Sequence, residues 1–428
     1  MKSLACLFLI TISFLVYKSF VHDNKISVDF SIKPQKKESK IGFLHSDNLK
    51  ILENNILILK PKLWRLGNTI TQKPKRIEQL NVLKKNNITP IIVINDLYST
   101  LDHDWQRPYL KSNKLLVDMI SDLYLELGNN VIYDIWNEPN MSWIGSEEQF
   151  FDTFKRVHNK IRSMPGGDKA IITGPSITGY HKDYLDRFLQ YCEKNNIRID
   201  ILNWHENGVQ NDAAIMKDNI NNAKNILIKK YPKVGIKDVA IYEFIRESDY
   251  FKPLTSLAYI NFLDLTSTAG CKTCGDAPKG QETENTCWNN SIDGLLTAQG
   301  KPRSVWWVYK YYAESLNTRF STSVDSENTV AITYYSQPNN SVNILLGNLS
   351  SSSSTFTIDL KTIQKFSLFS KSKKINYSLY KIPNTEQKEL LNPILIKKGN
   401  ISVTNKNIAS LSLDDIDTQS VYLLKMNN

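Results

Sequence analysis

Short apolar runs that end in polar or aromatic residues recur from residue 41 onward, and segments with helical periodicity separate them. Strands buried on both faces have this pattern, which is typical of a parallel sheet covered by helices. No Gly-rich phosphate-binding loop follows the first run, which disfavours an open doubly wound sheet, the second choice. The runs are "IGFLHSD" (41–47), "LWRLGN" (63–68), "PIIVIND" (90–96), "VIYDIWNEPN" (131–140), "AIITGPS" (170–176), "IDILNWHENG" (199–208) and "DVAIYEF" (238–244).

One more strand is needed to close an eight-stranded (β/α)₈ barrel. Either "TAGCKTC" (268–274) or "ENTCWNN" (284–290) supplies it, and the last helix lies around "SVWWVYKYYAES". The clearest helical pattern begins at Ser146, which forms a capping box with Gln149 and precedes an apolar stripe. The sequence therefore predicts an α/β fold with a (β/α)₈ barrel over residues 41–317.

The apolar period changes to two after residue 318, where Ser, Asn and Pro separate short alternating segments. This pattern predicts a C-terminal antiparallel β-sandwich over residues 318–428. A lead-in segment (21–40) contains the alternating "ISVDFSI" (26–32), which could add a strand to the sandwich from the other end of the chain. The C-terminal segments are "TVAITYYSQ", "SVNILLGNL", "STFTIDL", "NISVTN" and "SVYLLKM".

The N-terminus has the pattern of an export signal. Lys2 precedes the apolar run 3–17, and Lys18 ends it. The run is shorter than the ~20 residues of a membrane span, so residues 1–20 predict a secretory signal peptide, with an uncleaved membrane anchor as the alternative. In either case the rest of the chain is predicted to be secreted or displayed at the cell surface.

The cysteines beyond the signal are consistent with an oxidising compartment. No His lies near the cluster Cys271, Cys274 and Cys287, which disfavours a zinc site. A disulfide is the better interpretation, with Cys274 and Cys287 as the predicted pair. Cys192 follows the helical pattern "YLDRFLQY" and is expected to be a buried small hydrophobe.

Composition excludes several classes of function. The formal charge of +10 comes from Lys scattered through the chain, without an Arg-rich block, so nucleic-acid binding is not expected. An acidic ligand stays open. Hydrophobic residues make up 41% of 428 residues, which is enough for a large core. We find no metal, nucleotide or flavin signature, so we expect no cofactor, and we expect a monomer.

Two glutamates at predicted strand ends carry the functional prediction. The C-terminal ends of barrel strands converge on one mouth, where catalytic residues of such barrels lie. Glu138 closes the fourth predicted strand and Glu243 the seventh, so the two carboxylates should face each other. For one such residue a structural salt bridge is an equally good explanation, whereas the pair favours chemistry.

A facing carboxylate pair is what cleavage of a glycosidic bond requires. One carboxylate attacks the anomeric carbon and the other, protonated, donates to the departing oxygen. We predict a separation of about 5–5.5 Å, which gives retention of configuration, instead of the roughly 6.5–9.5 Å of inverting enzymes. Glu243 should be ionised beside Arg65, and Glu138 should be protonated against an apolar wall formed by Trp136 or Trp143.

The chain resembles clan A of the retaining glycoside hydrolases, and most nearly family 39 and its relatives. The resemblance covers about residues 41–317 and rests on "WNEPN", "NWHENG", "IYEF" and "CWNNSIDGLLTAQGKPRSVWWVYKYYAES". It implies that Glu138 is the general acid/base and Glu243 the nucleophile. Asn137 would bind the sugar 2-hydroxyl. Arg65 would lie beside the nucleophile, unless it forms only a buried ion pair that supports the barrel.

Other residues are predicted to line the cleft. The resemblance places a ring near strand six to orient the nucleophile, and His205 and Tyr242 occupy candidate positions. Trp288 is the predicted sugar-stacking platform. Glu206 departs from the clan pattern, since a third carboxylate at the mouth would be unusual. It could bind a substrate hydroxyl, pair with Lys or Arg, or point away, and at the mouth it would disfavour a uronic acid in the nearest subsite. Further candidates are Trp204, His45, Asp47, Asn95 and Asp96.

Two alternative functions use the same residues. A sugar-binding pseudoenzyme would keep the barrel without turnover, although a binding protein needs no acid and nucleophile together. A transglycosidase would use a sugar as acceptor in place of water. The sandwich is expected to support the barrel, because it contains no Trp; a separate carbohydrate-binding role is the alternative.

Overall fold

The computed structural model describes residues 24–46, 48–67, 70–97, 107–208, 212–275 and 289–428. The predicted signal segment therefore lies outside the described residues. The chain divides into two compact units. One comprises Glu38–Ala313 with Thr385–Asn392, and the other comprises the residues before 38, Glu314–Asn384 and Pro393–Asn428. Among the helices of the described ranges, none combines the length and apolar character that crossing a membrane requires.

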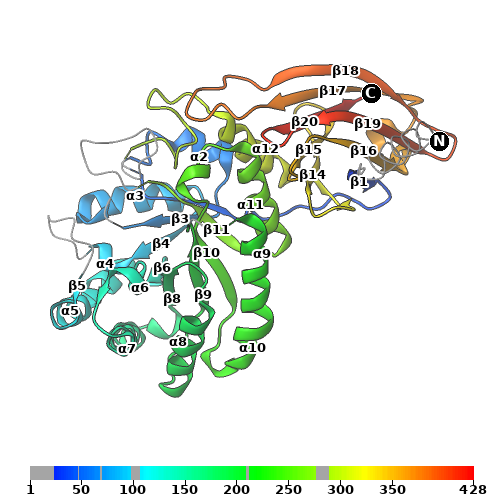
Figure 1. Ribbon diagram of the computed structural model, residues 1–428. Coiled ribbons are helices and arrows are strands. Elements are labelled where there is room, and N and C mark those ends of the chain that lie inside the picture. The colour runs from blue at the N-terminus through cyan, green and yellow to red at the C-terminus, as the bar shows by residue number, and fades with distance from the viewer. Residues whose placement is uncertain (1–23, 47, 68–69, 98–106, 209–211, 276–288) are drawn as a thin grey trace, which may run out of the picture. The chain divides into compact units, whose positions relative to one another are not determined.

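The first unit is a closed barrel of eight parallel strands, which confirms the predicted fold class (Figure 1). Every neighbouring pair of strands is parallel, and the first strand pairs with the last. Seven of the strands coincide with predicted apolar runs, and five of these lie wholly within a run. The barrel strands are β2 (Ile41–Leu44), β3 (Leu63–Leu66), β4 (Thr89–Val93), β6 (Ile132–Asp134), β8 (Ile171–Thr178), β9 (Ile201–Glu206), β10 (Asp238–Phe244) and β11 (Ala269–Lys272).

The eighth strand is the first of the two predicted candidates. β11 pairs with both β10 and β2 and so closes the barrel. Its Gly270 packs tightly, because an added Cβ would lie 2.9 Å from the Ile241 carbonyl oxygen. A short two-stranded sheet also forms, between β5 (Arg107–Pro108) and β7 (Trp143–Ile144).

Helices alternate with the barrel strands as predicted. In α7 the predicted capping box is present: Ser146 Oγ accepts from Gln149 N, and Gln149 Oε1 accepts from Ser146 N. Its apolar stripe, which includes Phe150 and Phe154, is buried. The helices are α2 (Glu53–Leu59), α3 (Lys73–Lys85), α4 (Ile94–Leu97), α5 (Tyr109–Leu127), α6 (Pro139–Ser142), α7 (Glu147–Ser163), α8 (Lys182–Lys194), α9 (Ala213–Asn222), α10 (Ile228–Lys230), α11 (Pro253–Leu265) and α12 (Ser304–Ser315).

The segment Thr385–Asn392 belongs to the barrel unit although it comes late in the chain. Hydrogen bonds to the start of α12 and the residue before it explain this. Arg303 Nε donates to the Gln387 carbonyl at 2.8 Å, and Trp307 Nε1 donates to the Leu390 carbonyl at 2.7 Å. The apolar pattern carries no signal for this return, because the contacts are made mainly through backbone carbonyl groups.

The second unit contains two β-sheets, as predicted for a sandwich. One has the order β13-β1-β16-β19 and the other β12-β14-β15-β20-β17-β18. β1 joins the first sheet and is parallel to β16, so this sheet is not wholly antiparallel. The strands are β1 (Asn24–Asp29), β12 (Arg319–Phe320), β13 (Thr322–Val324), β14 (Thr329–Ser336), β15 (Ser341–Asn348), β16 (Ser354–Lys361), β17 (Lys374–Ile382), β18 (Ile394–Ser402), β19 (Ile408–Ile416) and β20 (Val421–Asn427).

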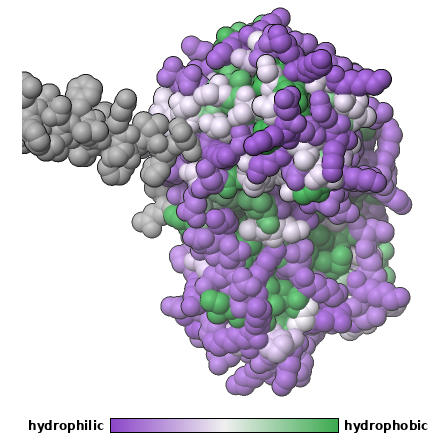
Figure 2. Space-filling view, turned by 90° about the vertical axis from the view of Figure 1, so that its right-hand side faces the viewer, coloured by the Kyte–Doolittle hydropathy of each residue, from purple (hydrophilic) through white to green (hydrophobic). Residues whose placement is uncertain are grey.

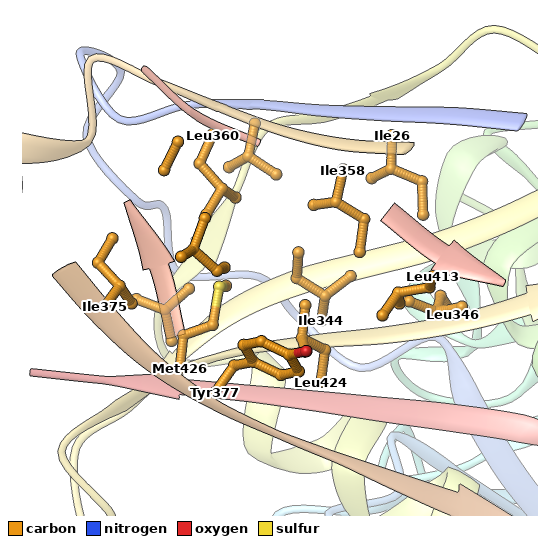
Figure 3. Close-up of a cluster of buried hydrophobic side chains, with 14 of the residues drawn as sticks. Ile26, Ile344, Leu346, Ile358, Leu360, Ile375, Tyr377, Leu413, Leu424 and Met426 are labelled. Atoms are coloured by element: carbon orange, nitrogen blue, oxygen red, sulfur yellow. The ribbon is translucent and has the colours of Figure 1, made fainter. Parts of the chain in front are cut away.

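The short strands β12 and β13 were not predicted. Nor were the longer strands β17 and β19. Polar residues on their outer faces interrupt the apolar pattern, whereas Ile375 and Leu413 on their inner faces are buried. These residues share one apolar core with Ile26 of β1 and Ile358 of β16 (Figure 3). Period-two alternation from both sheets thus fills the space between them, as in other sandwiches.

The surface agrees with the scattered charge expected from composition. Hydrophilic residues cover most of the face drawn in Figure 2, and hydrophobic residues form separate groups on it. Cys192 and Cys271 are free and buried. Cys274 is not among the free cysteines, and Cys287 lies outside the described residues, so the Cys274–Cys287 pairing stays a prediction.

Candidate active site

Alternation along the barrel strands decides which side chains face the barrel interior. Leu63, Ile132 and Ala240 form one apolar interior cluster with neighbouring residues. Arg65 and Asp134 lie two residues further along β3 and β6, so they face the same side one layer nearer the C-terminal strand ends. The barrel interior is therefore apolar in the inner layer and charged in the layer nearest the C-terminal strand ends, which form the mouth.

The backbone of Glu138 has an unusual conformation that directs its side chain. Its φ is 49°, in the left-handed region that non-Gly residues rarely occupy. The Glu138 N–H donates to the Ser176 carbonyl at 2.9 Å, and the preceding N–H, of Asn137, donates to Asn95 Oδ1 at 2.9 Å. The backbone of Asn137 and Glu138 is thus held from both sides, by Asn95 after β4 and by Ser176 of β8.

Glu243 reaches the mouth because of a β-bulge in β10. The register against β9 shifts between Ile241, which pairs with Trp204, and Glu243, which pairs with His205. Tyr242 is the extra residue and lies in the interior cluster. Without the bulge, Glu243 would alternate to the outer face.

The two carboxylates meet at the mouth, as the sequence predicts. Glu138, His205 and Glu243 each place one ligand atom within 4.8 Å of the others. The side chains of Glu138 and Glu243 are 15% and 14% exposed, so both are reachable from solvent. A carboxylate pair this close matches the ~5–5.5 Å of retaining glycosidases and is too close for inversion.

Arg65 is buried, with 1% of its side chain exposed, and it joins three acceptors. Its Nε and Nη2 donate to Asp134 Oδ2 at 3.0 and 2.8 Å, and Nη1 donates to Glu243 Oε1 at 2.9 Å. Nη2 also donates to Asn137 Oδ1 at 2.8 Å. Both interpretations of Arg65 from the sequence therefore apply: it contacts Glu243 and forms a buried ion pair.

Sequence reasoning missed a second layer of polar residues behind Arg65. Asp134 is fully buried and accepts from Ser176 Oγ as well as from Arg65. Ser176 in turn accepts from Asn203 Nδ2 at 2.5 Å. The signal for Asp134 was present, since a buried strand that ends on an acid two residues after an inward-facing Ile points that acid inward.

Two residues of "NWHENG" contact both carboxylates. His205 Nδ1 lies 2.8 Å from Glu138 Oε1 and 3.7 Å from Glu243 Oε2. Asn207 Nδ2 lies 2.9 Å from Glu243 Oε2 and 3.5 Å from Glu138 Oε1. His205 was predicted to orient the nucleophile, but its hydrogen bond goes to Glu138. Asn207 was not predicted, although it is two residues beyond His205 and so on the same face.

Electrostatics separate the two carboxyl groups. Burial raises the pKa of Glu243 above its ordinary value, and the negative charge of Glu138 raises it further. His205, Arg65 and the hydrogen bond from Asn207 act in the opposite direction and do not offset this increase. Burial also acts on Glu138, but hydrogen bonds from His205 and Asn207 bring its pKa below the ordinary value. These directions are the reverse of the predicted ones, because His205 bonds Glu138 instead of Glu243. Two carboxyl groups this close titrate as a pair.

The predicted apolar wall beside Glu138 is a second difference. The ring of Trp136 packs edge-on against Trp143 at 5.0 Å and against Phe150 of α7 at 6.2 Å. Its indole N–H donates to Ser142 Oγ at 2.8 Å. Trp136 therefore packs between the barrel and its helices, and the environment of Glu138 is set by polar neighbours.

Trp204 and Glu206 lie in the barrel wall, and this corrects their prediction as cleft residues. Both are completely buried. Trp204 Nε1 donates to Glu206 Oε1 at 2.6 Å, and Asn219 of α9 donates to the same oxygen at 2.8 Å. The reason is strand alternation: because His205 faces the mouth, its two neighbours face the helices.

The remaining predicted residues lie around the pair or beyond the described ranges. Tyr242 is buried, with its ring 6.0 Å from the Arg65 guanidinium carbon. His45 is buried below the mouth, and its N–H donates to the Arg65 carbonyl at 2.7 Å. Asn95 supports Asn137, as described above. Asp96 follows it on α4, and Trp288 and Asp47 lie outside the described residues.

Glu138, His205 and Glu243 could also hold a metal ion by their spacing alone. Both carboxylates already accept N–H groups, and the Arg65 cation lies 2.9 Å from Glu243, so a further cation would meet electrostatic repulsion. The arrangement fits proton transfer and nucleophilic attack better than metal binding.

Comparison with known proteins agrees with the fold and the site. Residues 101–245 match the family model for glycosyl hydrolases family 39. Three solved structures match along nearly the whole chain. They are N2152 from Neocallimastix frontalis (TM-score 0.74, 18% identity, 95% of this chain and 100% of that chain), the GH39 enzyme from Xanthomonas axonopodis pv. citri (0.66, 12%, 96% and 98%) and a GH39 β-xylosidase from Caulobacter crescentus (0.63, 13%, 94% and 100%).

The family match and the carboxylate pair define the class: the chain is a retaining O-glycoside hydrolase. At these identities the solved structures establish the fold. Within the class, residues 101–245 are similar to glycosyl hydrolases family 39, and this match includes both Glu138 and Glu243.

Proposed function

We propose that Glu243 is the nucleophile and Glu138 the general acid/base of a double displacement on a neutral sugar. One observation carries the assignment: the carboxylates lie within 4.8 Å at the barrel mouth, and only Glu243 accepts from Arg65. Arg65 opposes the burial and the Glu138 charge that raise the pKa of Glu243, and so favours the ionised form that a nucleophile needs. It also stabilises Glu243 as the leaving carboxylate of the second step.

The reaction balances in two steps. In the first, a Glu243 oxygen bonds to the anomeric carbon while the glycosidic C–O bond breaks, and the proton of Glu138 goes to the departing oxygen. In the second, Glu138 takes a proton from water as the water oxygen bonds to the same carbon and the Glu243 ester bond breaks. Two inversions at that carbon give net retention.

The charge of the site favours a neutral sugar at the bond that is cleaved. Arg65 is the cation that contacts the carboxylates among the described residues, and its donors already bond Asp134, Glu243 and Asn137. Among the described residues of the mouth, a sugar carboxylate would thus meet the two acids and an Arg65 whose donors are already occupied. Arg65 holds Asn137 Oδ1, which leaves its amide NH₂ to donate to the sugar 2-hydroxyl.

The test is a panel of aryl glycosides and oligosaccharides, with the products of the initial turnovers followed by proton NMR. Aryl β-xylosides come first, because the Caulobacter crescentus relative is named a β-xylosidase. We expect the first-formed sugar to keep the anomeric configuration of the substrate. A 2-fluoro glycoside should label Glu243, which peptide mass spectrometry would locate.

Three results would contradict the proposal. First formation of the opposite anomer would exclude double displacement, and labelling of another residue would remove Glu243 as nucleophile. Binding of sugars without any turnover across the panel would support the pseudoenzyme instead. Products longer than the substrate that predominate over hydrolysis even at low acceptor concentration would instead identify a transglycosidase, which uses the same double displacement.

Further proposals concern where the protein works. We propose that residues 1–20 direct export, that Cys274 and Cys287 form a disulfide, that the protein is a monomer and that the second unit supports the barrel. The support is the apolar run 3–17 and the cysteine spacing. Fractionation of cells that express the full chain, N-terminal sequencing, non-reducing peptide mapping and light scattering test these points. A reduced, cytosolic protein would contradict export.

A further inference from the structure

Asn207 stands out among the residues around the two glutamates, because one amide nitrogen reaches both. It follows β9, and its Nδ2 lies 2.9 Å from Glu243 Oε2 and 3.5 Å from Glu138 Oε1. An amide nitrogen carries two N–H groups and cannot accept. One N–H is therefore available for each carboxylate.

The orientation of this amide is fixed from its other end. Thr178 Oγ1 donates to Asn207 Oδ1 at 3.4 Å, which turns the nitrogen toward the carboxylates. Asn140 of the "WNEPN" motif holds Thr178 in turn, through bonds of 3.0 and 3.1 Å to its backbone N–H and carbonyl. The motif that contains Glu138 thus also orients Asn207.

The contacts of the two carboxylates differ in a way that depends on Asn207. Glu243 accepts from Arg65 at Oε1 and from Asn207 at Oε2, so each of its oxygens has a donor. His205 and Asn207 both donate to Glu138 Oε1, and the Thr178 side chain also interacts with Glu138. Because Oε1 accepts two N–H groups, Glu138 Oε2 is the oxygen favoured to carry the acidic proton.

On the basis of the proposed function, we propose that Asn207 is a positioning residue that controls both carboxylates at once. It keeps the two facing oxygens as acceptors and so holds two acids of like charge close together. In the covalent intermediate, its N–H on the Glu243 ester stabilises the carboxylate that departs in the second step. Neither Arg65 nor His205 replaces this contact, since each makes its short bond to one glutamate.

The test is the pH profile of kcat/KM for Asn207→Ala and Asn207→Asp on the best aryl glycoside. Loss of a donor raises the pKa of both carboxyl groups. The acidic limb, set by ionisation of Glu243, and the basic limb, set by deprotonation of Glu138, should therefore both move to higher pH. The acidic limb should move further, because that bond is the shorter one. We expect Asn207→Ala to lower kcat by about 10- to 100-fold.

Asn207→Asp keeps the size and the Thr178 contact but places a third carboxylate against the pair, so it should shift both limbs further and lower kcat more. Asn207→Gln, which retains the donor, should partly restore the wild-type limbs. The other titratable groups that interact with the pair are Arg65, His205 and, further away, Asp293 and Cys271, which interact electrostatically with Glu243. They are unchanged in all three variants.

The matched control is Asn219→Ala, which removes the amide that donates to Glu206 in the barrel wall. Both limbs of the kcat/KM pH profile of Asn219→Ala should stay at their wild-type positions. Asn207 variants that lose activity without moving either limb would reduce Asn207 to a structural role and overturn the inference. If Asn207→Ala does not fold, the isosteric Asn207→Asp decides the question. A wild type that cleaves no glycoside refutes the proposed function instead.

Discussion

The two faces of β9 place buried polar groups in opposite roles. On the inner face, His205 contacts Glu138, and Asn207, two residues further along the chain, contacts Glu243. On the outer face, Glu206 is equally inaccessible but accepts from Trp204 and Asn219. Burial of an acid therefore does not identify a catalytic group. The distinguishing feature is a second acid within reach, which the inner face has.

The difference is also one of electrostatic cost. Two carboxyl groups within 4.8 Å oppose each other's ionisation, and a buried cation, Arg65, is needed beside them. Glu206 is bonded by neutral indole and amide donors. The carboxylate pair on the inner face thus favours proton transfer. Glu206 on the outer face instead links β9 to α9.

The largest expected effect comes from Glu243→Gln. The amide keeps the shape but cannot form a stable ester with the sugar, so kcat should fall by about 10⁴-fold or more. Steady-state and single-turnover kinetics with an aryl glycoside measure it. Azide should restore turnover of Glu243→Ala and give a glycosyl azide of inverted configuration. Activity of Glu243→Gln within tenfold of the wild type would show that Glu243, on the inner face, is not the nucleophile.

Glu138→Ala should have the next largest effect, and the effect should depend on the leaving group. Loss of a general acid costs about 10²- to 10⁴-fold. Substrates with poor leaving groups should show the full loss, whereas dinitrophenyl glycosides, which leave without a proton, should show little loss in the first step. The measurement is a plot of log kcat/KM against leaving-group pKa. An equal loss for all leaving groups would contradict the role of Glu138.

The barrel and the pair at its mouth could be predicted because apolar runs and strand-end acids are local signals. Glu138 and Glu243 needed only the rule that strand ends converge. The inward direction of Glu243 depends on a bulge at Tyr242, which leaves no mark in an alternation pattern. The closer partner of His205 depends on side-chain placement across strands, so the sequence could not show that His205 lies 2.8 Å from Glu138 and 3.7 Å from Glu243.

Alternation could have prevented one error and explains another. Trp204, His205 and Glu206 are consecutive, so they cannot all face the mouth of a regular strand, and choosing His205 excludes its neighbours. In the second unit, β17 and β19 were missed because their outer faces are polar and break the apolar runs. Segment Thr385–Asn392 is held to the barrel unit through its backbone carbonyl groups, and a sequence pattern does not reveal such contacts.

A third prediction concerns stability against pH and uses another buried residue of the mouth. Burial, with the charge of Arg65, lowers the pKa of His45 to about 3. The folded state then binds fewer protons than the unfolded state between about pH 3 and 6.5, so stability is complete above that range and falls as pH drops. From pH 7 to 5 the loss should be about 2 kcal/mol.

Urea unfolding of wild type and His45→Asn at pH 7 and 5 measures this effect. Asn tolerates the φ of 41° at this position and does not titrate. The variant should therefore lose less stability on acidification than the wild type. His181→Asn, at an exposed position, is the control for removal of a histidine. Equal acid sensitivity of wild type and His45→Asn would exclude His45 as the cause.

The smallest expected effect belongs to Glu206→Gln, and it tests the comparison most directly. A Gln carbonyl oxygen can still accept from Trp204 and Asn219, so kcat/KM and its pH limbs should stay within about twofold of wild type, with a stability loss of about 1 kcal/mol. Glu206→Ala, which leaves both donors buried without their acceptor, should cost about 1–3 kcal/mol and still leave the limbs unchanged. Unfolding curves and pH profiles of both variants separate the two kinds of change. A loss of turnover in Glu206→Gln that approaches that of Glu243→Gln would mean that both faces of β9 take part in the chemistry, and strand alternation would then no longer distinguish the catalytic acids from the structural one.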